Sequence, residues 1–317
     1  YVSCSPVSSA LIGAFLKTFT GKPLVIDLRD PYAVTRVFEI VNFSRFRQVI
    51  DLRIQKYFLK HADLLIVNNE ETKTIYIEEC PDIKGKIFAI HNGLERQYLI
   101  NDKREKFQKF TIIYTGEFYF YALKSETFFE AMALLKQRGN INKDTFQFLF
   151  YGQDKNRIES IVINHDVRDL VLASTRVPYK DVLHAIARSH LQLLRIVKPM
   201  ISTKLFDGIP LNVPFLATIP QGEAEEIIHT YSPSSYVVTE DYGEKVAEAI
   251  LDAISRYENN EMADNHIEAF LERFSRENLT LKLMNIVEAV VSQRYSNKIS
   301  WLSGLWAVSS ITACASS

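Results

Sequence analysis

The sequence is short of cysteine, has no excess of charge of either sign and has no long hydrophobic run. Its three cysteines, Cys4, Cys80 and Cys314, are far apart and odd in number, so they suggest neither a disulfide framework nor a zinc cluster. The formal net charge of −1 gives no general attraction to DNA or RNA, and we expect no nucleic-acid partner. Because no run of about 18 apolar residues occurs, we expect no membrane-spanning helix. A reducing, cytoplasmic compartment is the expected location.

The composition, with 47% hydrophobic and 24% charged residues, is that of a globular protein. Short apolar runs alternate with segments of helical periodicity, a rhythm that predicts parallel sheets covered by helices. The expected strands are 23–29, 63–69, 86–92, 110–116, 146–152, 169–174, 191–196, 214–219 and 235–240. The expected helices are 7–20, 34–61, 70–79, 125–138, 154–163, 180–189, 203–210, 222–230 and 243–257, with two closing helices within 261–295.

This alternation occurs in two series, separated by a polar and charged segment at residues 96–109 that we interpret as a linker. The prediction is an α/β fold of two Rossmann-like, doubly wound domains that face each other across a cleft. The first domain is expected at 1–95, the second at 110–275, and a closing helix at 276–295. Because the opening segment already reads as the middle of a fold, the first domain is expected to be incomplete at its start.

Residues 296–317 differ from the rest of the chain, since they hold both tryptophans and many small residues. Two interpretations remain open for this tail: an amphipathic anchor, or sequence foreign to the fold.

In open α/β sheets, ligands bind beyond the carboxyl ends of the strands, so polar motifs at those ends are the best site candidates. Ser202, Thr203 and Lys204 fall at an expected helix start, where free N–H groups and the helix dipole favour an anion. The charge of Lys204 suits a diphosphate, and the carboxylate of Asp207, one turn later, suits the diol of a ribose. The alternative is a capped helix with a solvated lysine and aspartate.

A second candidate lies between the strand 110–116 and the next helix. Gly116 ends the strand and allows a close approach of backbone to a ligand. Lys124 stands at the expected start of the following helix, where phosphate is favoured. We expect the lysines at 124 and 204 to converge on one pyrophosphate; the alternative for Lys124 is a surface lysine.

Several segments resemble those of the family 4 glycosyltransferases, in the same order along the chain. They are GKPLVIDLRDPY (21–32), HADLLIVNNEETK (61–73), IFAIHNGLE (87–95), FTIIYTG (110–116), FQFLFYGQD (146–154), VPYKDVLHAIARSHLQLL (177–194) and STKLFDGIPLNVPFLATIP (202–220). The resemblance covers about residues 1–290. In two places the sequence departs from the family pattern, because Asp207 replaces a glutamate and Pro199 stands where many members carry a second one.

The resemblance implies a GT-B fold and the transfer of a sugar, with retention of configuration, from a nucleotide-diphosphate sugar to an acceptor hydroxyl. It further implies polysaccharide or glycolipid biosynthesis, a saccharide or lipid-linked acceptor, no bound metal and no cofactor beyond the sugar nucleotide. Gly152, Gln153, Val177 and Pro178 are the residues that it places on the side of the nucleotide base.

The charged residues Asp27, Arg29 and Asp30 follow an expected strand of the first domain. One interpretation is that they position the acceptor, with Asp30 as the catalytic candidate. The other is an Asp–Arg pair that braces the loop, since buried charges need partners.

The helical stretch 35–60 is basic and has an apolar stripe that includes Val49 and Ile50. It is either a packed helix with a solvated face or a surface that docks on anionic lipid at the inner face of the membrane.

Two other functions remain open from the sequence. A nucleotide-sugar epimerase of the same fold requires carboxylates and histidines in the cleft, for which only Asp30 and His91 are candidates. A truncated or degenerate module binds the nucleotide sugar without turnover.

Overall fold

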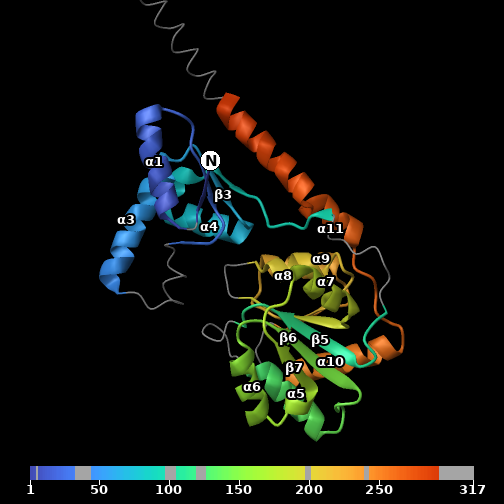
Figure 1. Cartoon of the computed structure of the whole chain (residues 1–317). Helices are drawn as coiled ribbons and strands as arrows, with labels where there is room; N and C mark the ends of the chain where they lie inside the picture. Colours follow the sequence, from blue (N-terminus) through green and yellow to red (C-terminus); the bar gives the residue numbers. More distant parts are fainter. Residues whose placement is uncertain are drawn as a thin grey trace, which may run out of the picture. The chain divides into compact units, whose positions relative to one another are not determined.

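The computed structural model describes residues 1–4, 6–32, 44–96, 105–118, 126–196, 201–238 and 243–292. The chain divides into two compact units (Figure 1). The first unit comprises Tyr1–Ile90 and Leu279–Ser317, and the second comprises His91–Asn278. The second unit therefore includes residues 91–95 and the described part of the expected linker, 105–109. The closing helix, 276–292 as far as it is described, starts in the second unit and continues in the first.

The first unit is built on a parallel sheet of four strands in the order β1-β2-β3-β4. Strands β2 and β3 are buried along their whole length, as their continuous apolar runs predict. The elements are β1 (Val2–Cys4), α1 (Ser8–Thr20), β2 (Val25–Leu28), α3 (Arg45–His61), β3 (Leu64–Val67), α4 (Glu70–Glu79), a 3₁₀ turn (Pro81–Ile83) and β4 (Ile87–Ala89).

Strand β1 was not expected from the sequence. It has only three residues, too few for a period-2 pattern, and it is defined by its parallel pairing with Ile26–Leu28 of β2. The helix α3 also differs from expectation. Val49 and Ile50, expected on its buried stripe, are exposed, whereas Asp51 and Gln55 are buried. Because Asp51 accepts a hydrogen bond from the hydroxyl of Tyr32 at 2.9 Å, a polar contact sets the face that the helix buries.

The second unit has a parallel sheet of six strands in the order β7-β6-β5-β8-β9-β10. The elements are β5 (Phe110–Thr115), α5 (Thr127–Gln137), β6 (Phe146–Tyr151), α6 (Lys155–Asn164), a 3₁₀ turn (Arg168–Leu170), β7 (Val171–Ser174), α7 (Tyr179–Arg188), β8 (Leu191–Arg195), α8 (Thr203–Gly208), β9 (Phe215–Thr218), α9 (Glu223–Tyr231), β10 (Tyr236–Val238), α10 (Gly243–Glu258) and α11 (Ile267–Phe274). The chain starts this sheet at β5, in the middle, and winds outward first one way and then the other. That is the doubly wound order, with its switch point between β5 and β8.

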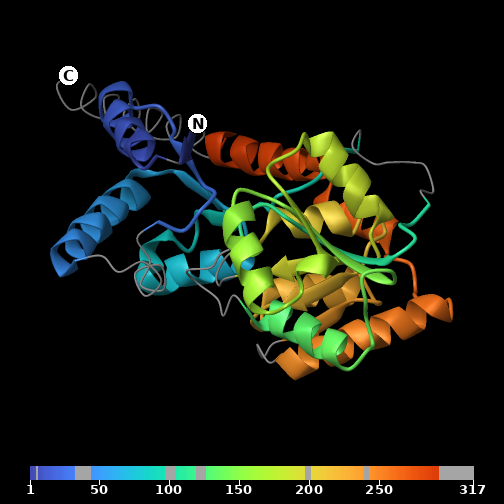
Figure 2. The same ribbon diagram turned by 60° about the horizontal axis from the view of Figure 1, so that its bottom comes forward.

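Both faces of the second sheet are buried. Helices α5, α6 and α10 cover one face, and α7, α8 and α9 cover the other (Figure 1). Alternate residues of β5 pack on opposite faces of the sheet. Ile112 and Tyr114 pack in an aromatic-rich core with α5 and α10, while Ile113 packs with α7. Helices α5 and α10 lie against each other beneath the sheet (Figure 2). The expected α/β class with two parallel-sheet units is confirmed.

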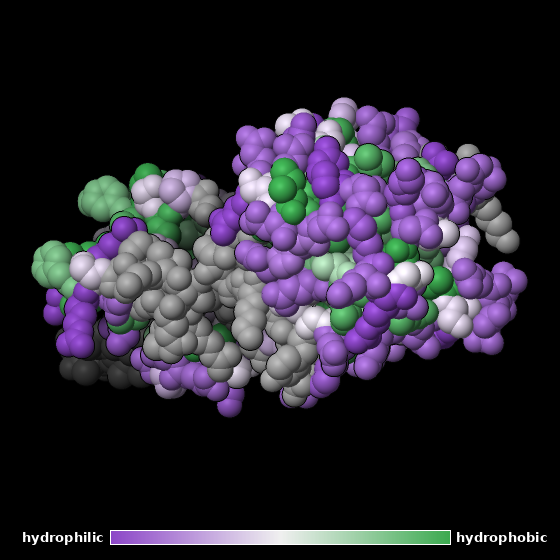
Figure 3. Space-filling view, turned by 90° about the horizontal axis from the view of Figure 1, so that it is seen from below, coloured by the Kyte–Doolittle hydropathy of each residue, from purple (hydrophilic) through white to green (hydrophobic). Residues whose placement is uncertain are grey.

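The surface of the second unit is mostly hydrophilic on the face drawn in Figure 3, with hydrophobic residues scattered singly. No helix within the described ranges is both long and apolar enough to cross a membrane. Lys124, Pro199 and the tail 296–317 lie outside the described residues.

Candidate functional site

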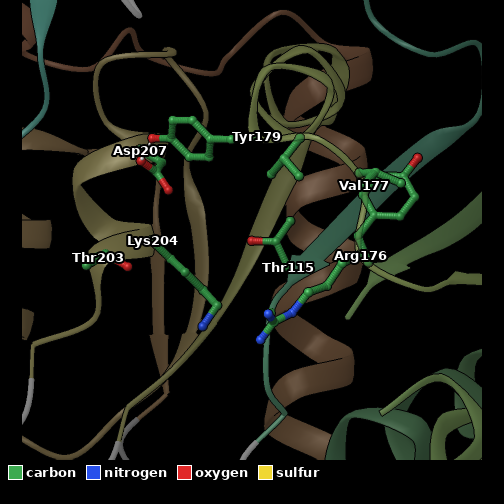
Figure 4. Close-up of a pocket in the computed structure, with 10 residues that line it drawn as sticks. Thr115, Arg176, Val177, Tyr179, Thr203, Lys204 and Asp207 are labelled. Atoms are coloured by element: carbon green, nitrogen blue, oxygen red, sulfur yellow. Dashed lines mark hydrogen bonds between the residues drawn. The ribbon is translucent and has the colours of Figure 1, made fainter. Parts of the chain in front are cut away.

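The second unit contains a cavity of about 270 Å³ at the carboxyl ends of its central strands (Figure 4). Its lining comes from the ends of β5 and β6, the loop after β7, and the first turns of α7 and α8. The lining residues are Thr115, Gly116, Tyr151, Arg176, Val177, Tyr179, Val182, Thr203, Lys204 and Asp207. The cavity lies at the switch point of the sheet, between β5 and β8, which is where ligands bind in doubly wound sheets.

Two glycines directly follow the strands β5 and β6 beside the cavity. Gly116 has a φ of +92°, which a side chain rarely adopts, and its N–H donates to the carbonyl of Tyr151 at 2.7 Å. A Cβ on Gly152 would lie 2.2 Å from the carbonyl oxygen of Gly116, so only glycine fits there. Gly152 does not line the cavity among the described residues. Its observed role is to let the ends of β5 and β6 pack closely.

Lys204 is the central cation of the cavity. Its side chain is only 8% exposed, and its ammonium lies 4.9 Å from the ring centre of Tyr114. A Cβ built on Gly116 would be 3.6 Å from Nζ of Lys204, so the ammonium lies directly against the glycine turn. Burial lowers the pKa of Lys204 to about 8, an effect that Asp207 and Glu117 oppose and Arg195 reinforces. At neutral pH most of the ammonium groups remain charged, and Lys204 lines the cavity.

Asp207 lies one helical turn after Lys204 and opens onto the same cavity. Its Oδ1 accepts a hydrogen bond from the hydroxyl of Tyr179 at 2.7 Å. Burial raises the pKa of Asp207 to about 6, while the Tyr179 hydroxyl, Lys204 and Arg276 act in the opposite direction. The carboxylate is therefore ionised at neutral pH, in the state that accepts hydrogen bonds from a diol.

The structure adds a second cation that sequence reasoning missed. In the close-up, the guanidinium of Arg176 and the ammonium of Lys204 point toward one another into the cavity (Figure 4). When the side-chain amide of Gln153 is turned with its oxygen toward the guanidinium, it accepts from Nε at 2.9 Å and from Nη1 at 3.1 Å. Gln153 thus lies against the edge of the site, through Arg176. The sequence signal for this second cation was that Arg176 directly precedes the base-side candidate Val177, in the loop after β7.

The start of α8 is only partly available to an anion. Ser202 is its N-cap, and its hydroxyl accepts from the backbone N–H of Lys204 at 3.3 Å. Thr203 lines the cavity. Because α8 has only six residues, its dipole is small, and the side chain of Lys204 is the main source of positive charge.

Arg195, at the end of β8, is another cation that the sequence analysis treated only as part of a strand. It is buried, donates to the carbonyl of Phe118 at 2.5 Å and lies 4.2 Å above the ring of Phe118. The N–H of Phe118 donates to Asp154 at 2.9 Å. These contacts hold Phe118, two residues after Gly116, in place.

The base-side candidates Val177 and Pro178 lie directly before α7. Val177 lines the cavity, and Pro178 is the N-cap of α7, whose carbonyl accepts from the N–H groups of Asp181 and Val182. Of the residues expected around the diphosphate, Gly116, Thr203, Lys204 and Asp207 come together in one cavity. Lys124 lies outside the described residues, so its convergence with Lys204 stays a prediction.

The acceptor-side candidates belong to the first unit. Asp27 is buried in β2, and its Oδ2 accepts from Nε of Arg29 at 3.0 Å and from the hydroxyl of Tyr1 at 2.6 Å. Arg29 also donates to the carbonyl of Ile90 at 3.4 Å. These contacts connect the end of β2 with Tyr1 and Ile90. Asp30 is exposed at the end of β2.

His91 and His190, both in the second unit, make structural contacts. Nε2 of His91 lies 2.5 Å from Oε1 of Glu223, and its ring packs edge-on against Phe274. Nδ1 of His190 accepts from the backbone N–H of Thr111 at 3.0 Å. Burial lowers the pKa of His190 to about 3, so this ring is neutral at physiological pH. Among the described residues, no group of three or more histidine, cysteine or acidic side chains is arranged to hold a metal ion.

Comparison with solved structures found chains of the same fold. HepE from Anabaena, in complex with UDP-glucose, aligns with a TM-score of 0.67 and 13% identity over 92% of this chain and 78% of HepE. A glycosyltransferase from Rickettsia africae aligns with a TM-score of 0.63 and 15% identity over 90% of this chain and 81% of its own. WaaG, a glycosyltransferase involved in lipopolysaccharide biosynthesis, aligns with a TM-score of 0.58 and 16% identity over 78% of this chain and 73% of WaaG.

No protein-family model matches the sequence, and a search of curated proteins found no match. The structural likeness extends over most of the chain, and at 13–16% identity it concerns the fold. The chain has the GT-B fold of these glycosyltransferases.

Proposed function

We propose that the protein is a glycosyltransferase, which moves a sugar from a nucleotide-diphosphate sugar to an acceptor hydroxyl with retention of configuration. The observation that carries the proposal is the cavity of the second unit, where Lys204, Arg176 and Asp207 meet at the switch point of a doubly wound sheet. Fold alone does not determine activity, whereas the chemistry of these three side chains supports binding of a nucleotide diphosphate.

Lys204 and Arg176 enter the cavity from different elements, α8 and the loop after β7. Two cations that point into one space suit a diphosphate, which carries its charge on two adjacent groups. As the sugar leaves, negative charge grows on the diphosphate, and a fixed ammonium in a partly desolvated site stabilises it. The glycine turn at Gly116 allows the diphosphate to approach both the backbone and Lys204.

Asp207 is the proposed ribose ligand, because its carboxylate opens onto the same cavity one turn away from the ammonium. Val177, on the wall beyond Arg176, is the apolar candidate for contact with the base. The reaction proposed for this arrangement uses no metal, since Lys204 and Arg176 supply the positive charge that a metal supplies elsewhere.

The first unit, which holds the acceptor-side candidates, is proposed to bind the acceptor. A saccharide or a lipid-linked saccharide is the proposed acceptor, and polysaccharide or glycolipid biosynthesis the proposed context. The helix α3 exposes Phe46, which is 77% exposed, together with Val49, Arg45 and Arg53. Apolar and basic side chains on one helix support peripheral contact with an anionic membrane, where such acceptors reside.

The test is a thermal-shift panel of sugar nucleotides and nucleoside diphosphates with uridine, guanosine, adenosine and thymidine bases. A ligand that binds the folded chain at one hundred times its Kd stabilises it by about 2.7 kcal/mol, which moves the melting temperature by several degrees. The proposal predicts a shift for at least one base, abolished when Lys204 is replaced by methionine. A panel without any shift would contradict it.

A further inference from the structure

The first turn of α7 places an aromatic hydroxyl against the carboxylate of the cavity. Tyr179 is the first residue of α7, and its hydroxyl donates to Oδ1 of Asp207 at 2.7 Å (Figure 4). The two residues come from different helices and are 28 positions apart in the sequence. A bond of this kind fixes one carboxylate oxygen in direction and not only in distance.

We propose that Tyr179 is a positioning residue, which orients the Asp207 carboxylate toward the ribose of the nucleotide and holds it in its charged form. The inference rests on the proposed nucleotide site and deepens it. An ionised carboxylate has about four acceptor positions on its two oxygens. The Tyr179 hydroxyl uses one of them, which leaves Oδ2 and the remaining position on Oδ1 for the two hydroxyls of a ribose.

The tyrosine is held firmly enough for this role. Pro178 caps α7, and its carbonyl accepts from Asp181 and Val182, so the helix begins at a fixed point. Further along α7, Leu183 and Ile186 are buried in the core between the helix and the sheet. The backbone of Tyr179 therefore cannot shift without disturbing that packing.

The charge state of Asp207 depends on the groups that face it. Among the described residues these are Tyr179 from α7, Lys204 from α8 itself and Arg276 from the start of the closing helix, while Arg176 lines the same cavity. Burial raises the pKa of Asp207 to about 6, and the hydrogen bond from Tyr179 is the largest of the effects that lower it. Without that bond the carboxylate takes up its proton at a higher pH, and at pH 6 fewer molecules present an acceptor for the ribose.

The experiment compares the wild type with Tyr179→Phe, which removes one oxygen and keeps the ring. UDP, ADP and GDP are titrated calorimetrically at pH 6.0 and pH 7.8, with inorganic diphosphate, which lacks the ribose, as a second probe. We expect the variant to bind the preferred nucleotide about fivefold more weakly at pH 6.0 and within twofold of the wild type at pH 7.8. Binding of inorganic diphosphate should be the same for both proteins.

Two further variants make the result specific. Tyr257→Phe is the matched control, because Tyr257 packs on Phe110 and His190, at the end of β5 opposite the cavity, and should leave both titrations unchanged. Asp207→Asn cannot titrate at position 207, so adding Tyr179→Phe to it should cause no further loss of nucleotide binding at pH 6.0 relative to pH 7.8. Carboxyl-carbon NMR of the free protein should show the Asp207 titration midpoint at higher pH in Tyr179→Phe.

The outcomes separate this inference from the proposed function. If the wild type binds none of the three nucleotides and no member of the thermal-shift panel shifts its melting temperature, the nucleotide site is wrong and the inference is rejected with it. If the wild type binds and Tyr179→Phe has the same binding curve at both pH values, the site stands and the role of Tyr179 is rejected. An equal loss at both pH values, with a lower melting temperature, would show a purely structural tyrosine and also reject the inference.

Discussion

At the residue scale, the cavity depends on two ionisable side chains whose pKa values are shifted in opposite directions by burial. The pKa of Lys204 falls to about 8 and that of Asp207 rises to about 6, although the two are one helical turn apart. Between these values both groups are charged. We therefore expect nucleotide binding to be strongest between pH 6 and pH 8, to weaken below that range as Asp207 takes up a proton, and to weaken above it as Lys204 loses one.

Removing the charge of Lys204 should weaken nucleotide binding and at the same time stabilise the folded protein. The folded pKa of about 8 lies below the unfolded value, so the buried ammonium opposes folding, fully below pH 8 and not at all above about 10.5. We predict that Lys204→Met raises the free energy of unfolding by about 1–2 kcal/mol at pH 7, and that the gain disappears as pH approaches 10.5. Urea unfolding at pH 7 and pH 10 measures both values.

Lys106→Met is the matched control for this prediction. Burial also lowers the pKa of Lys106 to about 8, and its ammonium, which does not line the cavity, donates to the carbonyls of Ala187 and Ser189 at 3.1 and 2.7 Å. Removing it deletes a hydrogen bond to each of two part-buried carbonyls, so this variant should lose stability at pH 7. If both variants lose stability alike, the Lys204 ammonium does not oppose folding and this prediction is wrong.

At the scale of elements, the ends of β5 and β6 must approach closely for the crevice to form. We predict that Gly152→Ala destabilises the protein by about 2–4 kcal/mol, because the added Cβ meets the carbonyl oxygen of Gly116 at 2.2 Å and backbone cannot yield as a side chain can. Gly85→Ala, where a Cβ meets nothing within 4 Å, is the control and should cost little. Thermal unfolding of the two variants decides the point, and equal melting temperatures would contradict it.

A separate prediction concerns membrane binding through the exposed face of α3. Each basic residue near an anionic surface contributes about 1 kcal/mol, so Arg45→Glu with Arg53→Glu should weaken binding to phosphatidylglycerol vesicles at least tenfold. The same change at Arg138 and Lys143, which are exposed on the second unit, should have little effect. Vesicle sedimentation at low and high salt measures this. Equal binding by both double variants would reject membrane contact through α3.

The order of the elements was largely predictable because parallel strands buried on both faces read as continuous apolar runs. All nine expected strands form, within about three residues of their expected bounds, as do α1 and α4. The exceptions have a common cause. β1 is too short for any pattern, and the face that α3 buries is set by the bond between Tyr32 and Asp51, which links residues 19 positions apart. Contacts at such a distance leave no local signal.

In the candidate site as well, features with a local sequence pattern were predicted, and features that depend on contacts between distant residues were not. Gly116, Lys204 and Asp207 were found because glycine turns and polar residues at strand ends are visible in a linear sequence. Arg176 and Tyr179 were missed because their relevance comes from partners on other elements, Gln153 and Asp207. Gly152 was placed on the base side, whereas in the structure its position against Gly116 gives it a packing role.

At the scale of the whole molecule, every residue of the candidate donor site belongs to the second unit. The acceptor-side candidates Asp27, Arg29 and Asp30 belong to the first. Donor binding can therefore be measured in the whole chain without knowing the acceptor, and it tests the part of the proposal on which turnover depends.

The most direct test is calorimetric titration of the full chain and its Lys204→Met variant with UDP, ADP and GDP at pH 7. The account predicts that the wild type binds at least one of them. It predicts that Lys204→Met binds at least tenfold more weakly, because a charge-assisted contact to a diphosphate contributes about 1.5–3 kcal/mol. If the Kd of the variant equals that of the wild type, Lys204 does not bind the diphosphate and the proposed donor site is wrong.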